Sequence, residues 1–333
     1  MKLDAVDPEL RRAVARIPRL PVRRKRARRV VRALVVRRGP GEPVEGVDVR
    51  VLDEGRGIRV YTPAGGGSGA ALLWVHGGGC AIGDVVQDNA FCATTARDLG
   101  IVVVSANYRL APEHPFPAAL DDLCAAWRWL RESAGSLGID RARVAVGGSS
   151  AGPGLAACLA QRLYDDGGTR PAAQWLFFPM LDDRTAARHE LDGVRHRVWD
   201  NTANRTGWAA CPGTAPGGPH TPEHAVASRR ADLSGLPPAW IGVGDIDLLA
   251  DECRACAGLL REAGVDCVFD LVPGAPHGFE TWAPRHTRRT GAAGARPCLA
   301  GRTGDRIDGD GTRRRMSRRP PVQVTTPQLT EPT

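Results

Sequence analysis

The sequence has no long apolar run. No window of 18 consecutive apolar residues occurs in its 333 residues, so we expect no helix that crosses a membrane. The first twenty residues, MKLDAVDPELRRAVARIPRL, interrupt every short apolar group with a charge, unlike the apolar core of a secretory signal. These absences favour a cytoplasmic protein without stable membrane insertion. Hydrophobic residues still make up 42% of the chain, enough to bury a large core.

The sequence also lacks a cysteine framework. Its nine cysteines are an odd number without paired spacing, which favours a reducing compartment and small buried thiols over a disulfide scaffold. Cys253 and Cys256 have zinc-like spacing, but no second pair accompanies them and both fall in an expected helix. The segment HTPEH at 220–224 matches H-x-x-E-H, which binds zinc only on a continuous helix, and Pro222 argues against that helix. We therefore expect no metal and no cofactor.

The net charge of +8 is unevenly distributed. Residues 1–38 carry +11 and residues 283–333 carry +7, so the segment between them carries −10. An acidic body argues against nucleic acid as a partner. In the basic run at 21–38, apolar residues recur at helical spacing, which favours an amphipathic helix with a solvated basic face over attraction to nucleic acid or anionic lipid. These apolar residues are Val30, Val31, Leu34 and Val35.

Between residues 47 and 272, short β-branched runs alternate with helical stretches. This alternation is typical of a mostly parallel sheet covered by helices on both faces. The first two strands, joined by the turn EGRG, should pair antiparallel at one edge. The expected strands are residues 47–53, 58–63, 71–76, 101–108, 144–148, 175–180, 239–245 and 267–272, and the expected helices are 88–98, 117–134, 152–165 and 249–263.

Two segments interrupt this alternation. The N-terminal segment 1–45 and the Arg-, His-, Gly- and Pro-rich segment 185–235 are expected to form a small helical cap. The core is then expected to comprise 46–184 and 236–282. Residues 283–333 contain almost no Leu, Ile, Val or Phe, so we expect this atypical basic tail to be disordered.

The stretch VAVGGSSAGPGLAA, residues 144–157, contains the spacing G-x-S-x-G. Gly148, Ser150 and Gly152 form it directly between an expected strand and an expected helix, which is the context of a nucleophile elbow. Ser149 lacks the two bracketing glycines. In a chain with 40 glycines, however, the pattern alone does not separate a nucleophile from a structural turn.

A nucleophilic serine needs a base, and the base needs an acid that orients it. Asp245, Asp247 and Asp251 follow one late expected strand, and His277 follows the next. The order Ser, Asp, His at the ends of successive strands is that of an α/β-hydrolase triad. Earlier in the chain, HGGG at 76–79 follows another buried strand, where consecutive glycines can aim backbone N–H groups at a developing oxyanion.

These motifs together resemble the hormone-sensitive-lipase family of bacterial carboxylesterases. The resemblance covers about residues 60–280 and implies an α/β-hydrolase fold with an eight-stranded, mostly parallel sheet flanked by helices and a small helical cap. Four blocks carry it, namely HGGG (76–79), SANYRLAPEHPFPAALDD (105–122), GGSSAG (147–152) and GDIDLLADE with PGAPHGF (244–252 and 273–279).

The family's roles transfer to matching positions of this sequence. The resemblance implies Ser150 as nucleophile, Asp247 as acid and His277 as base. It implies oxyanion donors at the amides of Gly78, Gly79 and Ala151. Supporting motif positions are His76, Gly77, Gly148, Gly152 and Glu113, with Arg109 and Asp121 expected to buttress the site beside Glu113.

Three features depart from the family pattern. Pro153 stands where the family has glycine, and because proline disfavours the α-region at Gly152, we expect reduced but not abolished activity. Cys80 stands where the family mostly has an aromatic residue, which predicts a roomier pocket. After Trp282 the basic tail replaces the family's last amphipathic helix, so we expect His277 to be less firmly held.

The sequence therefore predicts a serine carboxylesterase. It should hydrolyse short- to medium-chain carboxylic esters of small molecules through an acyl-enzyme on Ser150. Two alternatives remain open, a catalytically impaired esterase and a non-catalytic ligand-binding member of the same fold. Esterase and amidase preference, and monomer and homodimer, are not distinguished by these residues.

Overall fold

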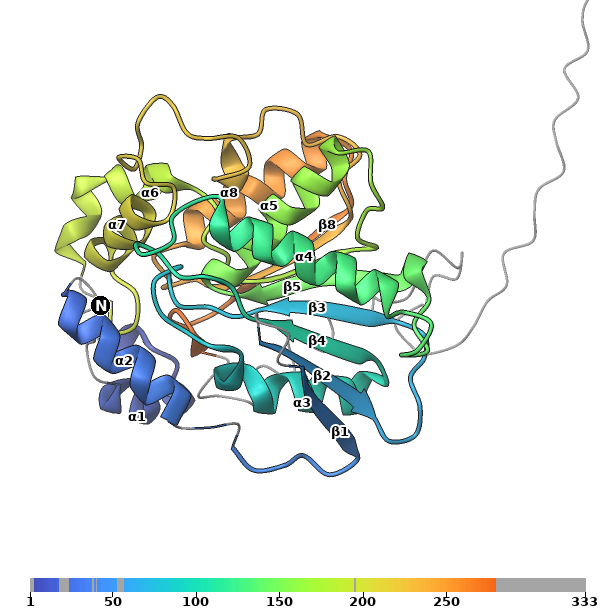
Figure 1. Cartoon of the computed structure of the whole chain (residues 1–333). Coiled ribbons are helices and arrows are strands. Elements are labelled where there is room, and N and C mark those ends of the chain that lie inside the picture. The colour runs from blue at the N-terminus through green and yellow to red at the C-terminus, as the bar shows by residue number, and fades with distance from the viewer. Residues whose placement is uncertain are drawn as a thin grey trace, which may run out of the picture. The chain divides into compact units, whose positions relative to one another are not determined.

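The structure, a computed structural model, describes residues 3–17, 24–37, 39, 41–52, 57–194 and 196–279. The basic tail at 283–333 and most of the turn EGRG lie outside these residues. The described residues form an eight-stranded sheet with helices on both faces (Figure 1). The expected mostly parallel, helix-covered sheet is confirmed.

All eight expected strands are present in the order β1-β2-β4-β3-β5-β6-β7-β8. The first two pair antiparallel, as expected, and β2 also pairs antiparallel with β4. The remaining pairings are parallel. The strands are β1 Val47–Leu52, β2 Ile58–Pro63, β3 Ala71–Val75, β4 Val102–Ala106, β5 Val144–Ser149, β6 Gln174–Phe177, β7 Ala239–Gly244 and β8 Cys267–Val272.

The central strands are apolar along their length because both of their faces are covered. Every residue of β3, β4 and β5 is buried. Since β3, β5, β7 and β8 run in the same direction, the loops that follow them meet at one edge of the sheet. This edge receives the HGGG block, the G-x-S-x-G serine and the late Asp and His residues.

Four helices lie within two residues of the expected positions. In α4, buried Leu120, Leu123, Trp127 and Leu130 recur at intervals of three and four, which explains both the helix and the face it buries. α3 covers one face of the sheet, and α4 and α5 pack together on the other (Figure 1). These helices are α3 Asn89–Leu99, α4 Ala118–Glu132, α5 Ala151–Asp165 and α8 Ala250–Glu262.

The two segments expected to form a cap contain further helices. The N-terminal segment holds α1 Pro8–Arg16 and α2 Lys25–Arg37, and the segment around 185–235 holds α6 Asp183–Ala187 and α7 Asn201–Ala210. Their action as a cap stays a prediction. Among the described helices, none combines the length and the apolar character needed to cross a membrane.

The apolar residues of the basic helix α2 were expected to form its buried face. The structure shows a different buried face. Val31 is buried, but Val30 is 57% exposed and Leu34 is 55% exposed. The reason is that Arg32 points inward, where its Nε donates to Ala81 O at 2.9 Å and its Nη2 donates to Ala111 O at 2.8 Å. The buried face of α2 is therefore set by a guanidinium anchor, rotated away from the apolar row.

One buried acid joins α8 to the segment after β6. Oε1 of Glu252 accepts hydrogen bonds from the amides of Leu181, at 2.7 Å, and Asp182, at 3.2 Å. Burial raises the pKa of Glu252 to about 8. The adjacent amide of Met180 donates to the carbonyl of Ser150 at 2.9 Å, so this segment also contacts the serine turn.

The raised pKa of Glu252 predicts a pH-dependent loss of stability. The folded state keeps the proton up to about pH 8, whereas the unfolded chain loses it near 4.5. Stability contributed by protonated Glu252 is therefore complete below pH 4.5, declines as pH rises, and is lost above pH 8. Across this window we expect wild-type Tm to fall relative to that of Glu252→Gln, whose neutral amide does not titrate.

Thermal denaturation from pH 5 to 9 measures this difference. Glu262→Gln, at an exposed position on the same helix, is the matched control and should follow wild type. A constant Tm difference between wild type and Glu252→Gln across the range would contradict the raised pKa.

Candidate active site

Ser150 lies in the sharp turn between β5 and α5. Its φ of 62° and ψ of −111° are unusual for a residue with a side chain. Flanking hydrogen bonds hold the turn, because its amide donates to Phe177 O at 3.0 Å and its carbonyl accepts from Met180 N at 2.9 Å. The turn places the Ser150 hydroxyl at the edge of the sheet, while Ser149 is the last residue of β5 and is buried.

The glycines around Ser150 have a steric cause. A Cβ at Gly152 would lie 2.0 Å from Val75 O, and one at Gly148 would lie 2.3 Å from the same oxygen. The end of β3 therefore presses directly against the turn, and only glycine fits at both positions. This contact explains why the spacing G-x-S-x-G marks the serine at its centre.

The structure brings Ser150, His277 and Asp247 into one hydrogen-bonded chain. Ser150 Oγ lies 2.8 Å from His277 Nε2, and His277 Nδ1 lies 2.8 Å from Asp247 Oδ2. The three side chains come from the ends of β5, β8 and β7, as their order in the sequence predicts. Both His277 and Asp247 are buried, which shields their interaction from water.

Geometry also separates the three candidate acids. The second oxygen of Asp247, Oδ1, accepts from Leu249 N at 2.9 Å, so the carboxylate is fixed from both sides. Asp245 instead accepts from Gly274 N at 2.7 Å, and Asp251 pairs with Arg254 at 3.1 Å on the surface. Of these three aspartates, Asp247 is the one that contacts His277.

The loop that carries His277 is braced within the described part of the chain. Asp245 holds Gly274 N, and Gly274 O accepts from Asp7 N at 2.9 Å. The segment before α1 therefore packs against the histidine loop, a contact that no sequence motif signals. The basic tail was expected to hold His277 less firmly, because it replaces the family's last helix. This tail lies outside the described residues.

The HGGG block lies beside the serine turn. A Cβ at Gly77 would meet Ser149 O at 2.7 Å and the Ser150 Cβ at 3.2 Å, so the two loops touch. Gly78 has a φ of 122°, a conformation that side chains rarely adopt, and it begins a tight turn in which Ala81 N and Ile82 N donate to Gly78 O at 3.1 and 3.0 Å.

Three backbone amides near Ser150 are available as donors. Among the described residues, the N–H groups of Gly78, Gly79 and Ala151 donate to no acceptor. Ala151 is also the first residue of α5, where the helix dipole is positive. These amides have the chemistry required to stabilise an oxyanion formed at Ser150.

His76, the first residue of the HGGG block, is held in place by its neighbours. The ring is fully buried, stacks on Tyr108 with centroids 4.3 Å apart, and places Nε2 3.0 Å from Asn107 Oδ1. The Tyr108 hydroxyl donates to His76 O at 3.1 Å. Asn107 and Tyr108, which the sequence pattern did not single out, thus support the glycine loop.

The residues expected to buttress the site have other partners. Arg109 pairs with Asp122 at 2.9 Å, and Asp121 accepts from Arg162 of α5 at 2.7 Å, so both pairs brace α4. Glu113 pairs with Arg32 of α2 at 2.9 Å. In the described structure none of these side chains touches the Ser-His-Asp chain. The expected buttress is therefore indirect, through α2, α4 and α5.

Trp199 is a site residue that no motif indicated. Its indole packs against Gly79, where a Cβ would lie 2.2 Å from Trp199 Cη2, and stacks near His277 with centroids 6.2 Å apart. Its Nε1 donates to Asn204 Oδ1 at 3.2 Å, which fixes the ring. Nearby, burial lowers the pKa of His196, against the charge of Asp247, and so favours a neutral imidazole.

A narrow apolar pocket adjoins Ala151. Its free volume is about 10 Å³, roughly that of one water molecule. The thiol of Cys80 lines it, and a hydrogen bond to Cys211 together with burial raises the pKa of Cys80 well above its usual range, so it stays a neutral thiol. The other lining residues include Gly154, Leu155, Cys158, Met180, Trp208, Ala225 and Ala227.

The weak metal motif does not form its helix. The described residues at 220–224 are turn and coil, and His224 Nε2 lies 2.7 Å from Asp165 Oδ2. Asp165, Glu223 and His224 cluster on the surface, but Arg230 already pairs with the Asp165 carboxylate. One of the two carboxylates in this cluster is therefore already paired with a cation.

Pro153 occupies the third position of α5, where a missing N–H loses no helical hydrogen bond. The obstacle expected at Gly152 does not occur, because Gly152 is helical in spite of the following proline. The effect of Pro153 on activity stays a prediction, and the helical Gly152 favours little effect over the expected loss.

We expect Pro153→Gly to leave kcat/KM for p-nitrophenyl acetate within about twofold and to lower stability by roughly 1 kcal/mol, because glycine frees the unfolded chain. Steady-state kinetics and thermal denaturation measure the two effects. A tenfold gain in turnover would show instead that the proline strains the serine turn.

Known proteins resemble this chain in sequence and in structure. A model of the alpha/beta hydrolase fold family matches residues 72–281. The carboxylic ester hydrolase LipN of Mycobacterium tuberculosis is 38% identical over 229 residues, which are 66% of this chain and 60% of LipN. The carboxylesterase NlhH of the same species is 35% identical over 232 residues, which are 68% of this chain and 72% of NlhH.

A solved structure of a bacterial heroin esterase matches with a TM-score of 0.81 at 34% identity, covering 90% of this chain and 99% of that one. The family match extends over more than half of the chain and contains the HGGG block, the serine turn, Asp247 and His277. The chain belongs to the α/β-hydrolase family and to its hormone-sensitive-lipase group of carboxylic ester hydrolases.

Proposed function

We propose that this chain is a serine carboxylesterase that hydrolyses esters of short acyl groups through an acyl-enzyme on Ser150. The observation that carries the proposal is the hydrogen-bonded chain Ser150–His277–Asp247 beside three free backbone N–H donors. No metal or cofactor is required by this chemistry, since base, acid and oxyanion donors all come from the chain.

The reaction begins with proton transfer from Ser150 Oγ to His277 Nε2. Oγ attacks the ester carbonyl carbon, and the amides of Gly78, Gly79 and Ala151 accommodate the resulting oxyanion. Collapse breaks the carbon–oxygen bond, and the imidazolium returns its proton to the leaving alcohol. Throughout, Asp247 holds the Nδ1–H of His277 and stabilises its positive charge.

Deacylation repeats these steps with water. His277 takes a proton from water, hydroxide attacks the acyl carbon, and Ser150 leaves as the recipient of the proton. The carboxylic acid departs and the hydrogen-bonded chain is restored. The positive φ of Ser150 keeps its hydroxyl at the edge of the sheet in both half-reactions.

The acyl group is inferred from the pocket beside Ala151. Ala151, whose amide is a proposed oxyanion donor, lines this pocket together with Trp208 and Cys211. A free volume of about 10 Å³ leaves little room for a long chain. Short acyl groups thus fit with minor side-chain movement, whereas medium chains require the indole of Trp208 to move.

The nucleophile is tested by replacing each of two neighbouring serines with alanine. Ser150→Ala should reduce kcat for p-nitrophenyl acetate by about 10⁴-fold or more, because the attacking oxygen is removed. Ser149→Ala is the matched control, and it should retain activity within a few fold because Ser149 ends a strand. Equal activity of Ser150→Ala and wild type would remove this mechanism. A folded wild type without turnover would favour the non-catalytic alternative.

The acyl pocket is tested by a chain-length series from p-nitrophenyl acetate to octanoate. We expect kcat/KM of wild type to be highest for the shortest esters. Trp208→Leu opens the end of the pocket and should shift the optimum by at least two carbons. Trp129→Leu, a half-buried indole on α4 that does not line this pocket, serves as the control. An unchanged optimum in Trp208→Leu would place the acyl chain elsewhere.

A further inference from the structure

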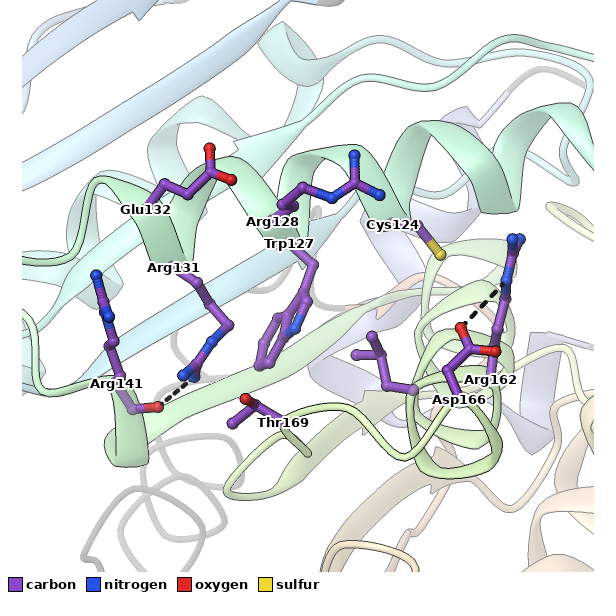
Figure 2. A pocket seen from close by; sticks show the side chains of 10 residues that line it. Cys124, Trp127, Arg128, Arg131, Glu132, Arg141, Arg162, Asp166 and Thr169 are labelled. Atoms are coloured by element: carbon purple, nitrogen blue, oxygen red, sulfur yellow. Dashed lines mark hydrogen bonds and ion pairs between the residues drawn. The ribbon is translucent and has the colours of Figure 1, made fainter.

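A second pocket lies far from the proposed catalytic serine. Its free volume is about 320 Å³, and it lies between the last turns of α4 and α5 and the short helix η3, Arg141–Arg143 (Figure 2). Arg141 stands just before β5, and Ser150 directly follows that strand. Six strand residues span roughly 20 Å, so the pocket and Ser150 are at opposite ends of β5.

The pocket gathers more positive than negative charge. Among its guanidinium groups, Arg162 pairs with Asp121 at 2.7 Å and lies 3.9 Å from Asp166. Arg128, Arg131 and Arg141 form no ion pair with any carboxylate of the described residues. Glu132 and Asp166 also line the pocket, so four arginines face two carboxylates and a positive excess remains.

The unpaired arginines are positioned by the fold. Arg131 Nη1 donates to the carbonyl of Arg141 at 2.7 Å, and the Arg131 guanidinium lies over the indole of Trp127, 5.8 Å from its centroid. Figure 2 shows these side chains around the same concavity. Partial burial, and after it the charge of Arg141, lowers the pKa of Arg131.

Local structure does not account for this cluster. Arginines in the last turn of a helix interact favourably with its dipole, which explains why single cations end α4 and α5. It does not explain why three unpaired cations line one concavity in a chain whose segment 39–282 carries −10. Like charges at close range destabilise the fold unless an anion joins them.

We propose that this pocket binds a small phosphorylated anion, of which pyrophosphate is the simplest probe. A carboxylate offers two oxygens and one charge, whereas a phosphoryl group offers three oxygens and about two charges, enough to engage several guanidinium forks. Thr169 adds a hydroxyl donor at the rim. The volume is at the lower end of that of small-molecule sites, which suits a compact anion.

Isothermal titration of the full-length protein with pyrophosphate tests this site. At fixed ionic strength, wild type should bind, and Arg131→Gln and Arg141→Gln should each weaken binding by about tenfold or more, the effect of losing one charge-assisted contact. Arg254→Gln, which removes a surface arginine of α8, is the matched control and should bind like wild type. Arg141 is exposed, so Arg141→Gln should fold normally and keeps the test decisive even if Arg131→Gln misfolds.

Three further arms decide the outcome. Ser150→Ala should bind pyrophosphate like wild type, which separates this site from the proposed catalytic centre. Inorganic sulfate should bind less tightly than pyrophosphate, because it carries fewer charges. Absence of pyrophosphate binding, or equal weakening by Arg254→Gln, would overturn the proposal. Binding of an oligonucleotide or of anionic vesicles without binding of pyrophosphate would also overturn it, in favour of a macromolecular partner.

Discussion

The positive φ of Ser150 is the constraint on which the site depends. A residue with a side chain adopts a φ of 62° at a cost of about 1–3 kcal/mol, so the surrounding structure must impose it. It does so through the carbonyl of Phe177, the amide of Met180 and the end of β3. The parallel sheet supplies all of these contacts, because β3, β5 and β6 end side by side.

The same edge of the sheet explains how distant residues converge. His277 is 127 positions from Ser150 along the chain, yet the two lie in hydrogen-bonding contact because their strands end at one edge. The burial of Asp247 adds rigidity, since its two oxygens are held by His277 and by the Leu249 amide. Segments outside the sheet then reinforce the edge, with Asp7 at the histidine loop and Arg32 at the loop after the glycines.

Local patterns made the strands, the main helices and the serine turn predictable. The β-branched runs are visible in the sequence because whole strands are buried. The spacing G-x-S-x-G is visible because the backbone of Val75 lies so close to positions 148 and 152 that only glycine fits there. The choice of Asp247 among three aspartates came only from the resemblance, and in the structure Asp247 is the one in hydrogen-bonding contact with His277. The inward turn of Arg32 was not predictable, because it is set by carbonyls of Ala81 and Ala111 far along the chain.

Trp199 and the cationic pocket were not predictable from the sequence for the same reason, because their contacts join segments far apart in the chain. Trp199 reaches the glycine loop from a segment without periodicity, and the unpaired arginines come from α4 and η3, which meet only in the fold. Charge summed along the chain pointed to its ends, whereas the structure adds a compact cationic pocket within an otherwise acidic body.

Covalent trapping tests directly whether Ser150 Oγ is the attacking atom. A p-nitrophenyl phosphonate ester should react once per chain, and mass mapping of the digested adduct should place the phosphonyl group on Ser150. The same reagent should leave Ser150→Ala unlabelled. A label on Ser149, or on any other residue while Ser150 stays unlabelled, would show that Ser150 is not the nucleophile.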